Sequence, residues 1–179
     1  MTTQMIRSYY DDDKIKVHEE YYQACGLKEG EYRYYCIEGP LFNRCFYVNN
    51  KREGPSFTYH RNGKLYKSVQ MYINGRLNGE YREYYETGAL AKTCYYKDDC
   101  LQGEYRCYYK NGILNSLRHY DDDKLNGEYT IYHSNGQLWK HSVYRYGLME
   151  GELVNYYPDG TLKSISIYVN DRRISIREF

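Results

Sequence analysis

"LQGEYRCYYKNGILNSLRHYDDD", which runs from Leu101 to Asp123, nearly copies "LNGEYREYYETGALAKTCYYKDD", which runs from Leu77 to Asp99. The two stretches begin 24 residues apart. A short stretch copied at a fixed period is typical of proteins that stack one small structural unit many times. The residues that the copies share therefore indicate what each unit needs.

Three residue types recur at fixed places in every copy. A glycine opens the copy, a tyrosine follows five residues later, and a leucine follows eleven residues later. The opening glycines are Gly30, Gly54, Gly79, Gly103, Gly127 and Gly151; the tyrosines are Tyr35, Tyr59, Tyr84, Tyr108, Tyr132 and Tyr156; the leucines are Leu41, Leu65, Leu90, Leu114, Leu138 and Leu162. We therefore predict a single array over residues 1–179, with a degenerate copy in 1–29, repeats 30–53, 54–78, 79–102, 103–126, 127–150 and 151–174, and a cap in 175–179.

Turn signals divide each copy into two β-rich segments. Asn-Gly or Asp-Gly lies between them in "RNGKL", "KNGIL", "SNGQL" and "PDGTL", and these pairs favour tight hairpin turns. The second connection, such as "YKDDCLQG", is polar and turn-prone, so consecutive hairpins should follow one another in antiparallel order. No stretch shows the apolar spacing of a helix.

The predicted fold class is accordingly all-β: an elongated, single-layer antiparallel meander of ~24-residue β-hairpins, open and twisted or curved. The Tyr and Leu columns, for example Tyr84, Tyr108, Leu90 and Leu114, should form one continuous packed strip. With 27 tyrosines against 4 phenylalanines and 1 tryptophan, the aromatic content also favours half-buried positions on a sheet.

Composition narrows the classes of function. The formal net charge is +1, which gives no reason to expect nucleic acid as a partner. The sequence shows no signal peptide and no apolar run of ~20 residues, so we expect a cytoplasmic location. The six cysteines lack zinc-ligand spacing and are expected to be free thiols; the alternative is a cross-strand pair of Cys94 with Cys107.

No residue pattern in the sequence strongly indicates catalysis or metal binding. The glutamates after the opening glycines, such as Glu31, Glu80 and Glu104, are expected to pair with Arg33, Arg82 and Arg106 rather than to act as acids and bases. The "DDDK" runs lack calcium-loop spacing. His60 and His133 stand where other copies have tyrosine and should replace a packing aromatic. We predict no catalytic residue, no cofactor and no metal, and hence no enzyme.

The repeated pattern "NGxLxGEYxxYYxNGxLxxxxxY" resembles the MORN repeat, and more closely its variant form in bacterial antitoxin-like proteins and large DNA viruses. The similarity covers about residues 9–174 and departs at "GPSFTYH" (residues 54–60), where the repeat should bend or fray. The resemblance implies an open, curved sheet that acts as a scaffold, a dimerisation surface or a partner-binding trough. Lipid binding is also proposed for this family.

The predicted function is a non-enzymatic interaction or scaffold module that binds a protein partner or itself. Tyr32, Tyr81, Tyr105 and Tyr129 should form the interaction surface, because they point away from the Tyr84, Tyr108 and Tyr132 side of the sheet. The alternatives are a module that binds a membrane surface, lipid or small ligand, and an antitoxin or immunity-type protein. Assembly of a viral particle, with a location in the virion, is a further possibility that the resemblance suggests.

Overall fold

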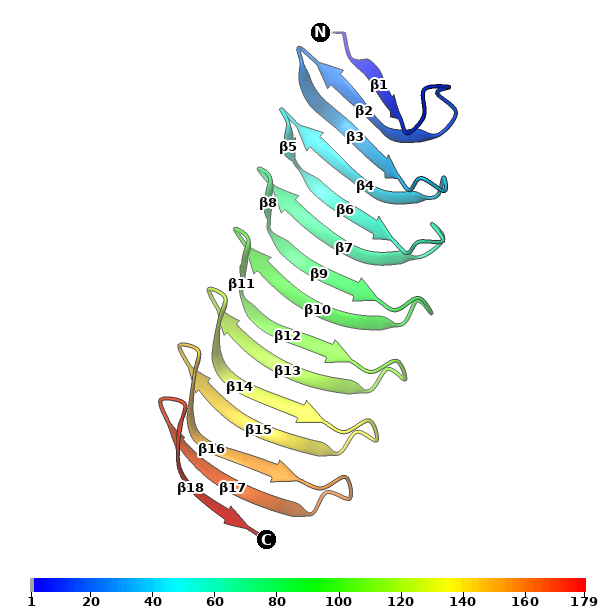
Figure 1. The fold of residues 1–179 in the computed structure, drawn as a ribbon. Helices are drawn as coiled ribbons and strands as arrows, with labels where there is room; N and C mark the ends of the chain where they lie inside the picture. The colour runs from blue at the N-terminus through cyan, green and yellow to red at the C-terminus, as the bar shows by residue number, and fades with distance from the viewer. Residues whose placement is uncertain (1) are drawn as a thin grey trace. The chain divides into compact units, whose positions relative to one another are not determined.

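The computed structural model describes residues 2–179, and the regular structure within them is entirely β-sheet. The chain forms two compact units, Met1–Gly88 and Ala89–Phe179. In each unit the strands follow one another in antiparallel order and form a single layer (Figure 1). The predicted fold class, an all-β antiparallel meander of hairpin repeats, is confirmed.

The first unit contains nine strands. They are β1 (Gln4–Tyr9), β2 (Val17–Ala24), β3 (Leu27–Tyr35), β4 (Leu41–Val48), β5 (Lys51–Arg52), β6 (Gly54–Tyr59), β7 (Tyr66–Ile73), β8 (Arg76–Leu77) and β9 (Gly79–Tyr84). The short strand β5 and the longer β6 both pair with β4, so they are two parts of one interrupted strand.

The second unit repeats this arrangement. Its strands are β10 (Leu90–Lys97), β11 (Cys100–Leu101), β12 (Gly103–Tyr108), β13 (Leu114–Asp121), β14 (Lys124–Tyr132), β15 (Leu138–Arg145), β16 (Leu148–Tyr156), β17 (Leu162–Val169) and β18 (Arg172–Glu178). The last strand, β18, runs across the cap boundary expected at residue 174.

The opening glycine has a backbone conformation that other residues rarely adopt. Gly127 has a φ of +119°, and a Cβ atom there would lie 3.1 Å from the Cβ of His119 on the neighbouring strand. The register between β13 and β14 shifts at this point. Glycine recurs at this position because all six opening glycines have positive φ, which other residues rarely adopt.

Both kinds of connection are tight turns. At the Asn-Gly turn, the Gly112 amide donates to the carbonyl oxygen of Tyr109 at 2.9 Å. At the other connection, Asp122 and Asp123 both have positive φ, as the two central residues of a type I′ hairpin turn require. The aspartates of the "DDDK" run are therefore turn residues.

The degenerate N-terminal copy folds as a hairpin as well. Its strands β1 and β2 pair over most of their length, and the side chain of Asp11 accepts a hydrogen bond from the Ile15 amide at 2.9 Å. This side chain organises the turn in place of the missing glycine.

The segment 54–60 does not fray, so that part of the prediction was wrong. Gly54–Tyr59 form β6, which pairs with β4 and β7, and its register with β7 shifts between Thr58 and Tyr59; Ser56 is fully buried. The ladder between β4 and β6 consists of the Asn43–Thr58 and Arg44–Phe57 pairs, so Pro55 lies beyond its end. The missing N–H of this proline therefore costs no bond in that ladder.

Neither unit contains a core of large side chains. The well-buried residues are small: Cys45, Cys94, Ser56, Ser68, Ser116, Thr130, Ser142, Ser164 and Ser166. The Tyr and Leu columns lie side by side, as in the opposed pair Tyr108 and Leu114, but these leucines are only half-buried, and Leu65 is 41% exposed. A sheet of one layer brings side chains into contact without enclosing them.

We predict that Leu114→Ala lowers the free energy of unfolding by about 1–2 kcal/mol, less than the ~2–5 kcal/mol typical of a fully buried leucine. The half-buried side chain loses contact with Tyr108 but leaves little closed cavity. Urea unfolding followed by circular dichroism measures the change. Leu65→Ala, in the same column but more exposed, is the matched control and should cost less; a larger loss at Leu65 would contradict this explanation.

Candidate interaction surface

In the second unit, a line of opposed residues crosses four strands on one face of the sheet. Tyr105 on β12 lies opposite Arg118 on β13, Arg118 lies opposite Tyr129 on β14, and Tyr129 lies opposite Ser142 on β15. Directly opposed residues of antiparallel strands point to the same side. We call this side the tyrosine face, and the side that carries Tyr108 and Leu114 the leucine face.

Arg118 lies between two aromatic rings. The central carbon of its guanidinium group is 5.5 Å from the ring centre of Tyr105 and 4.8 Å from that of Tyr129. Cation–π attraction to both rings stabilises the charge. Burial opposes this charge, but the neighbouring hydroxyls of Tyr129 and Tyr120 outweigh it, so the pKa of Arg118 lies above its ordinary value.

The charge of Arg118 has no acidic partner. Within residues 2–179 it forms no ion pair, and its Nε atom is buried without a hydrogen-bond partner. The hydroxyl oxygen of Ser116, two residues earlier on the same face of β13, is also buried without a partner. Buried polar groups normally have partners, so these two atoms mark a place where the fold leaves hydrogen-bonding capacity unused.

A second aromatic line runs beside the first. Tyr120 lies 5.7 Å from Tyr105, and Tyr144 lies 6.0 Å from Tyr129, measured between ring centres. Burial raises the pKa of both Tyr105 and Tyr144. The rings are therefore partly removed from water even though no second layer covers them.

A hollow of about 200 Å³ opens on the tyrosine face over β14, β15 and β16. It is lined by Tyr129, Ile131, Lys140, Ser142, Tyr144, Met149 and Leu153. The lining combines aliphatic and aromatic side chains with Ser142 and Lys140, and Lys140 is its one charged residue. The ammonium group of Lys140 also lies 5.3 Å from the ring centre of Trp139.

Small residues make room for the rings. Ser142, opposite Tyr129, is 3% exposed, and Ser166, opposite Leu153, is also 3% exposed. A large side chain on one strand thus covers a small one on the next. This alternation, rather than a second layer, is what buries apolar surface in the unit.

We predict that Ser142→Leu costs about 1–3 kcal/mol of unfolding free energy, because the larger side chain has to displace the ring of Tyr129. Val143→Leu, at the adjacent exposed position on the leucine face, is the control and should change stability by less than about 0.5 kcal/mol. Urea unfolding of the two variants distinguishes them. Equal effects would show that Ser142 is not a packing position.

The first unit builds its tyrosine face in the same way but places a carboxylate beside one of its cations, Lys28. Tyr32 lies opposite Tyr21 and Cys45, and the ammonium group of Lys28 is 4.5 Å from the Tyr32 ring centre. Glu19 accepts a hydrogen bond from the Tyr32 hydroxyl at 2.7 Å and lies 3.9 Å from the Lys28 ammonium group. Burial and this carboxylate raise the pKa of Tyr32.

The four tyrosines expected to form the interaction surface are all half-buried. Tyr105 and Tyr129 lie in the second unit on either side of Arg118. Tyr32 and Tyr81 lie in the first unit, where the Tyr81 hydroxyl donates to Glu83 at 3.1 Å. The opposed pairs place Tyr105 on the tyrosine face and Tyr108 with Leu114 on the leucine face.

Sequence reasoning did not single out Arg118. A signal was nevertheless present: the residue 15 positions after the opening glycine is small in most copies, being Cys45, Cys94, Ser142 and Ser166. Arg118 occupies the equivalent position after Gly103. A large cation in a column of small residues was the sequence signal that this position differs from its equivalents in the other copies.

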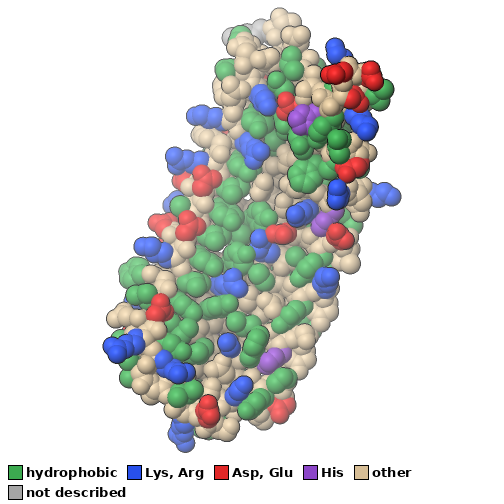
Figure 2. All heavy atoms as spheres, in the orientation of Figure 1, with side chains coloured by type: hydrophobic (Ala, Val, Ile, Leu, Met, Phe, Trp, Pro, Cys, Tyr) green, Lys and Arg blue, Asp and Glu red, His purple; other side chains and the backbone are tan. Residues whose placement is uncertain are grey.

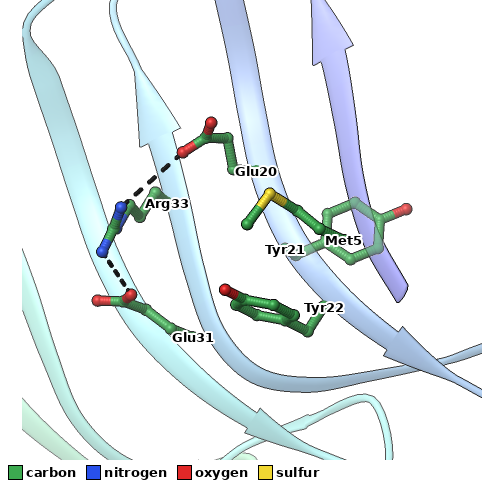
Figure 3. Close-up of a pocket in the computed structure, with 6 residues that line it drawn as sticks. All are labelled: Met5, Glu20, Tyr21, Tyr22, Glu31 and Arg33. Atoms are coloured by element: carbon green, nitrogen blue, oxygen red, sulfur yellow. Dashed lines mark hydrogen bonds and ion pairs between the residues drawn. The ribbon is translucent and has the colours of Figure 1, made fainter. Parts of the chain in front are cut away.

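The leucine face carries the expected ion pairs. Arg33 pairs with Glu31 at 2.6 Å, Arg82 pairs with Glu80 at 2.7 Å, and Arg106 pairs with Glu104. Figure 3 shows Arg33 between Glu31 and Glu20 at a hollow of about 20 Å³. This volume is little more than one water needs, and the carboxylates are engaged by arginine.

His133 performs the packing role predicted for it. Its ring stacks on Trp139 at 5.3 Å, and its Nε2 atom lies 3.3 Å from the Tyr156 carbonyl oxygen. His60 reaches the Tyr84 carbonyl oxygen in the same way, at 3.1 Å. In another copy, the Tyr109 hydroxyl donates to the Tyr132 carbonyl oxygen.

The aspartates and cysteines considered as possible metal ligands or redox residues also have structural roles. Asp123 accepts a hydrogen bond from the Leu101 amide at 2.7 Å, and residues 2–179 contain no group of three or more His, Cys, Asp or Glu arranged to hold a metal. None of the six cysteines forms a disulfide, and Cys107 lies opposite Lys92 rather than Cys94. No helix in the described chain has the length and apolar character needed to cross a bilayer.

Repeated hairpins in a single layer, with aromatic rows on a face that no second layer covers, define a β-repeat protein of the interaction type. The chain belongs to the MORN repeat variant family, whose model matches residues 52–74, 77–98, 101–122, 125–146 and 149–170, more than half of the chain. The hairpin of β3 and β4 lies outside these matches but has the same register. No curated protein matches the chain.

We predict that stability falls in alkali. Burial raises the pKa of Tyr96 to about 12, and a hydrogen bond to Tyr34 together with burial raises that of Tyr10 to about 12, whereas a tyrosine in the unfolded chain titrates near ~10. The stabilisation is complete below about pH 10 and is lost as the pH rises through about 12.

Urea midpoints measured by circular dichroism across this window, with absorbance of tyrosinate recorded in parallel, test the prediction. Tyr96→Phe should weaken the pH dependence, and Tyr146→Phe, at a ring that is 70% exposed, is the control. A midpoint that stays constant across the window would contradict the burial of these hydroxyls.

Proposed function

We propose that the protein is a non-enzymatic module for protein–protein interaction or scaffolding, and that the tyrosine face of its second unit contacts the partner. The observation that supports this proposal is the aromatic and cationic surface around Arg118 on an uncovered sheet face. MORN repeats are generally interaction modules without enzymatic activity, which agrees with this proposal.

The composition of the surface supports a protein partner. Tyrosine and arginine are enriched where proteins bind one another, because they supply a large contact area together with hydrogen-bonding groups. Figure 2 shows a face of the molecule on which hydrophobic side chains form a band with lysine and arginine side chains among them. Trp139 and Tyr157 remain 41% and 42% exposed, so apolar area is available for a partner to cover.

The narrower roles suggested by the family resemblance have less support. Assembly of a viral particle and an antitoxin or immunity role have no observation of their own in either unit. Binding of a membrane surface, lipid or small ligand is the second candidate, and the hollow beside Lys140 is the feature that favours it. The experiments below separate these classes of partner.

The double variant Tyr105→Ser/Tyr129→Ser should abolish association while the hairpins remain folded. Association with a second copy is measured by light scattering, and association with a partner by capture from the native source. The matched control is Tyr108→Ser/Tyr132→Ser, which removes two tyrosines from the same strands, β12 and β14, on the leucine face.

Two results would overturn the proposal. One is a protein that stays monomeric and captures no partner. The other is a partner that both double variants release equally. Circular dichroism and thermal unfolding of each variant confirm that lost binding reflects the surface rather than the fold.

A further inference from the structure

Charge is distributed unevenly between the two faces of the second unit. The register places the carboxylates Glu104, Glu128, Glu150 and Glu152 on the leucine face. It places Lys92, Arg118, Lys140 and Arg173 on the tyrosine face. Within strands β10–β18, Glu178 on the last strand is the one carboxylate that the register assigns to the tyrosine face. The tyrosine face of the second unit is therefore cationic, although the net charge of the whole chain is only +1.

Two cations of this face, Arg118 and Lys140, are available to a partner. Arg118 and Lys140 form no ion pair within residues 2–179, whereas Lys28 in the first unit has Glu19 beside it. Holding a guanidinium group half-buried without a counterion has a free-energy cost that an anionic partner would offset. The same partner could use the buried Nε atom of Arg118 only after a rearrangement of the flanking rings, so its terminal nitrogens are the first contact.

The hollow beside these cations selects for an apolar group. Ile131, Met149 and Leu153 line it, and Lys140 stands in its lining as the only charge. Aliphatic and thioether side chains of this kind pack against another aliphatic side chain. The surface therefore combines a recess that contains three aliphatic or thioether side chains with cations on the same face.

The spacing of the cations matches an extended peptide. Arg118 is on β13 and Lys140 on β15, two strands apart, and Lys140 is in register with Ser116, two residues along β13 from Arg118. Two strand spacings combined with this offset give a separation of about 12 Å between the two backbone positions. Three to four residues of an extended chain span about 10–14 Å. Two carboxylates three or four residues apart on such a chain would reach both cations.

We infer that the tyrosine face of the second unit binds an extended acidic peptide segment, with carboxylates at Arg118 and Lys140 and an apolar side chain in the hollow lined by Met149 and Leu153. This inference rests on the proposed function and names the chemistry of its partner. Nucleic acid fits less well, because Lys140 is the one cation in the lining of the hollow, whereas a nucleic-acid groove follows the phosphates with many cations. A lipid headgroup would match the charge but not the spacing across strands.

The test is a selection of random 12-residue peptides displayed on phage against the full-length chain, followed by measurement of the selected peptides by fluorescence anisotropy. We expect enrichment of Asp and Glu together with one aliphatic residue. Lys140→Glu should weaken binding of a selected peptide at least tenfold and shift the selection away from acidic peptides. Arg118→Met, which keeps an unbranched stem between the rings, should weaken binding comparably.

Arg145→Glu is the matched control. Arg145 is an exposed residue on the same strand as Lys140 but on the leucine face, so this variant makes the same type of charge change without touching the surface. Its binding should stay within twofold of the unchanged chain. Thermal unfolding of all three variants verifies that each is folded.

Several outcomes would overturn the inference. These are a selection without acidic enrichment, a selection that yields no binding peptide, equal loss in Lys140→Glu and Arg145→Glu, or binding only to polyuridylate or phosphatidylserine vesicles tested in parallel. If the selection fails but Tyr105→Ser/Tyr129→Ser still abolishes association, the proposed function stands and only the acidic peptide is wrong. If neither Lys140→Glu nor Tyr105→Ser/Tyr129→Ser affects any association, both the proposed function and the inference of an acidic peptide are wrong.

Discussion

The structure depends on one packing arrangement: a large side chain on one strand lies over a small side chain on the next. Tyr129 and Ser142, and Leu153 and Ser166, are pairs of this kind. A single-layer sheet has no other element against which to bury apolar surface, so burial must come from neighbours within the layer. The stability of each hairpin therefore depends on the hairpins beside it, as in other repeat proteins.

Hydrogen bonds between successive connections maintain the register that this packing requires. The Asp123 amide donates to the Leu101 carbonyl oxygen at 3.1 Å while the Asp123 side chain accepts from the Leu101 amide. Asp171 makes the same pair of bonds to Met149. A shift of one residue would break these bonds and turn every tyrosine to the other face, so turns and rings specify the same register.

The fold could be predicted because its determinants are local in sequence. Glycine at the bulge, Asn-Gly or Asp-Asp at the turns, and the Glu-x-Arg pairs each act within one hairpin, and the copies repeat the signal. The behaviour of residues 54–60 could not be predicted from composition, because whether Pro55 costs a hydrogen bond depends on where the ladder between β4 and β6 ends. The burial of the leucines likewise depends on the absence of a second layer above them.

The candidate surface was only partly predictable. Alternation along a strand was enough to place Tyr105 and Tyr129 on the face opposite Tyr108 and Tyr132. Their neighbours across the sheet come from other hairpins, and identifying them requires the register between strands. That register brings Arg118 between two rings and Lys140 into the lining of the hollow over β14, β15 and β16.

The substitution of arginine for a small residue at position 118 shows how a repeat array can acquire specificity. Ser142 at the equivalent position of another copy is covered by its neighbours and offers nothing to a partner. Arg118 keeps the same backbone place, uses the same flanking rings for cation–π contact, and adds a charge that no carboxylate of the described chain neutralises. In the first unit, by contrast, the Glu19 carboxylate lies beside the Lys28 ammonium group and offsets its charge. Because each hairpin contacts only its neighbours, one such exchange changes the surface locally and leaves the architecture of the other copies intact.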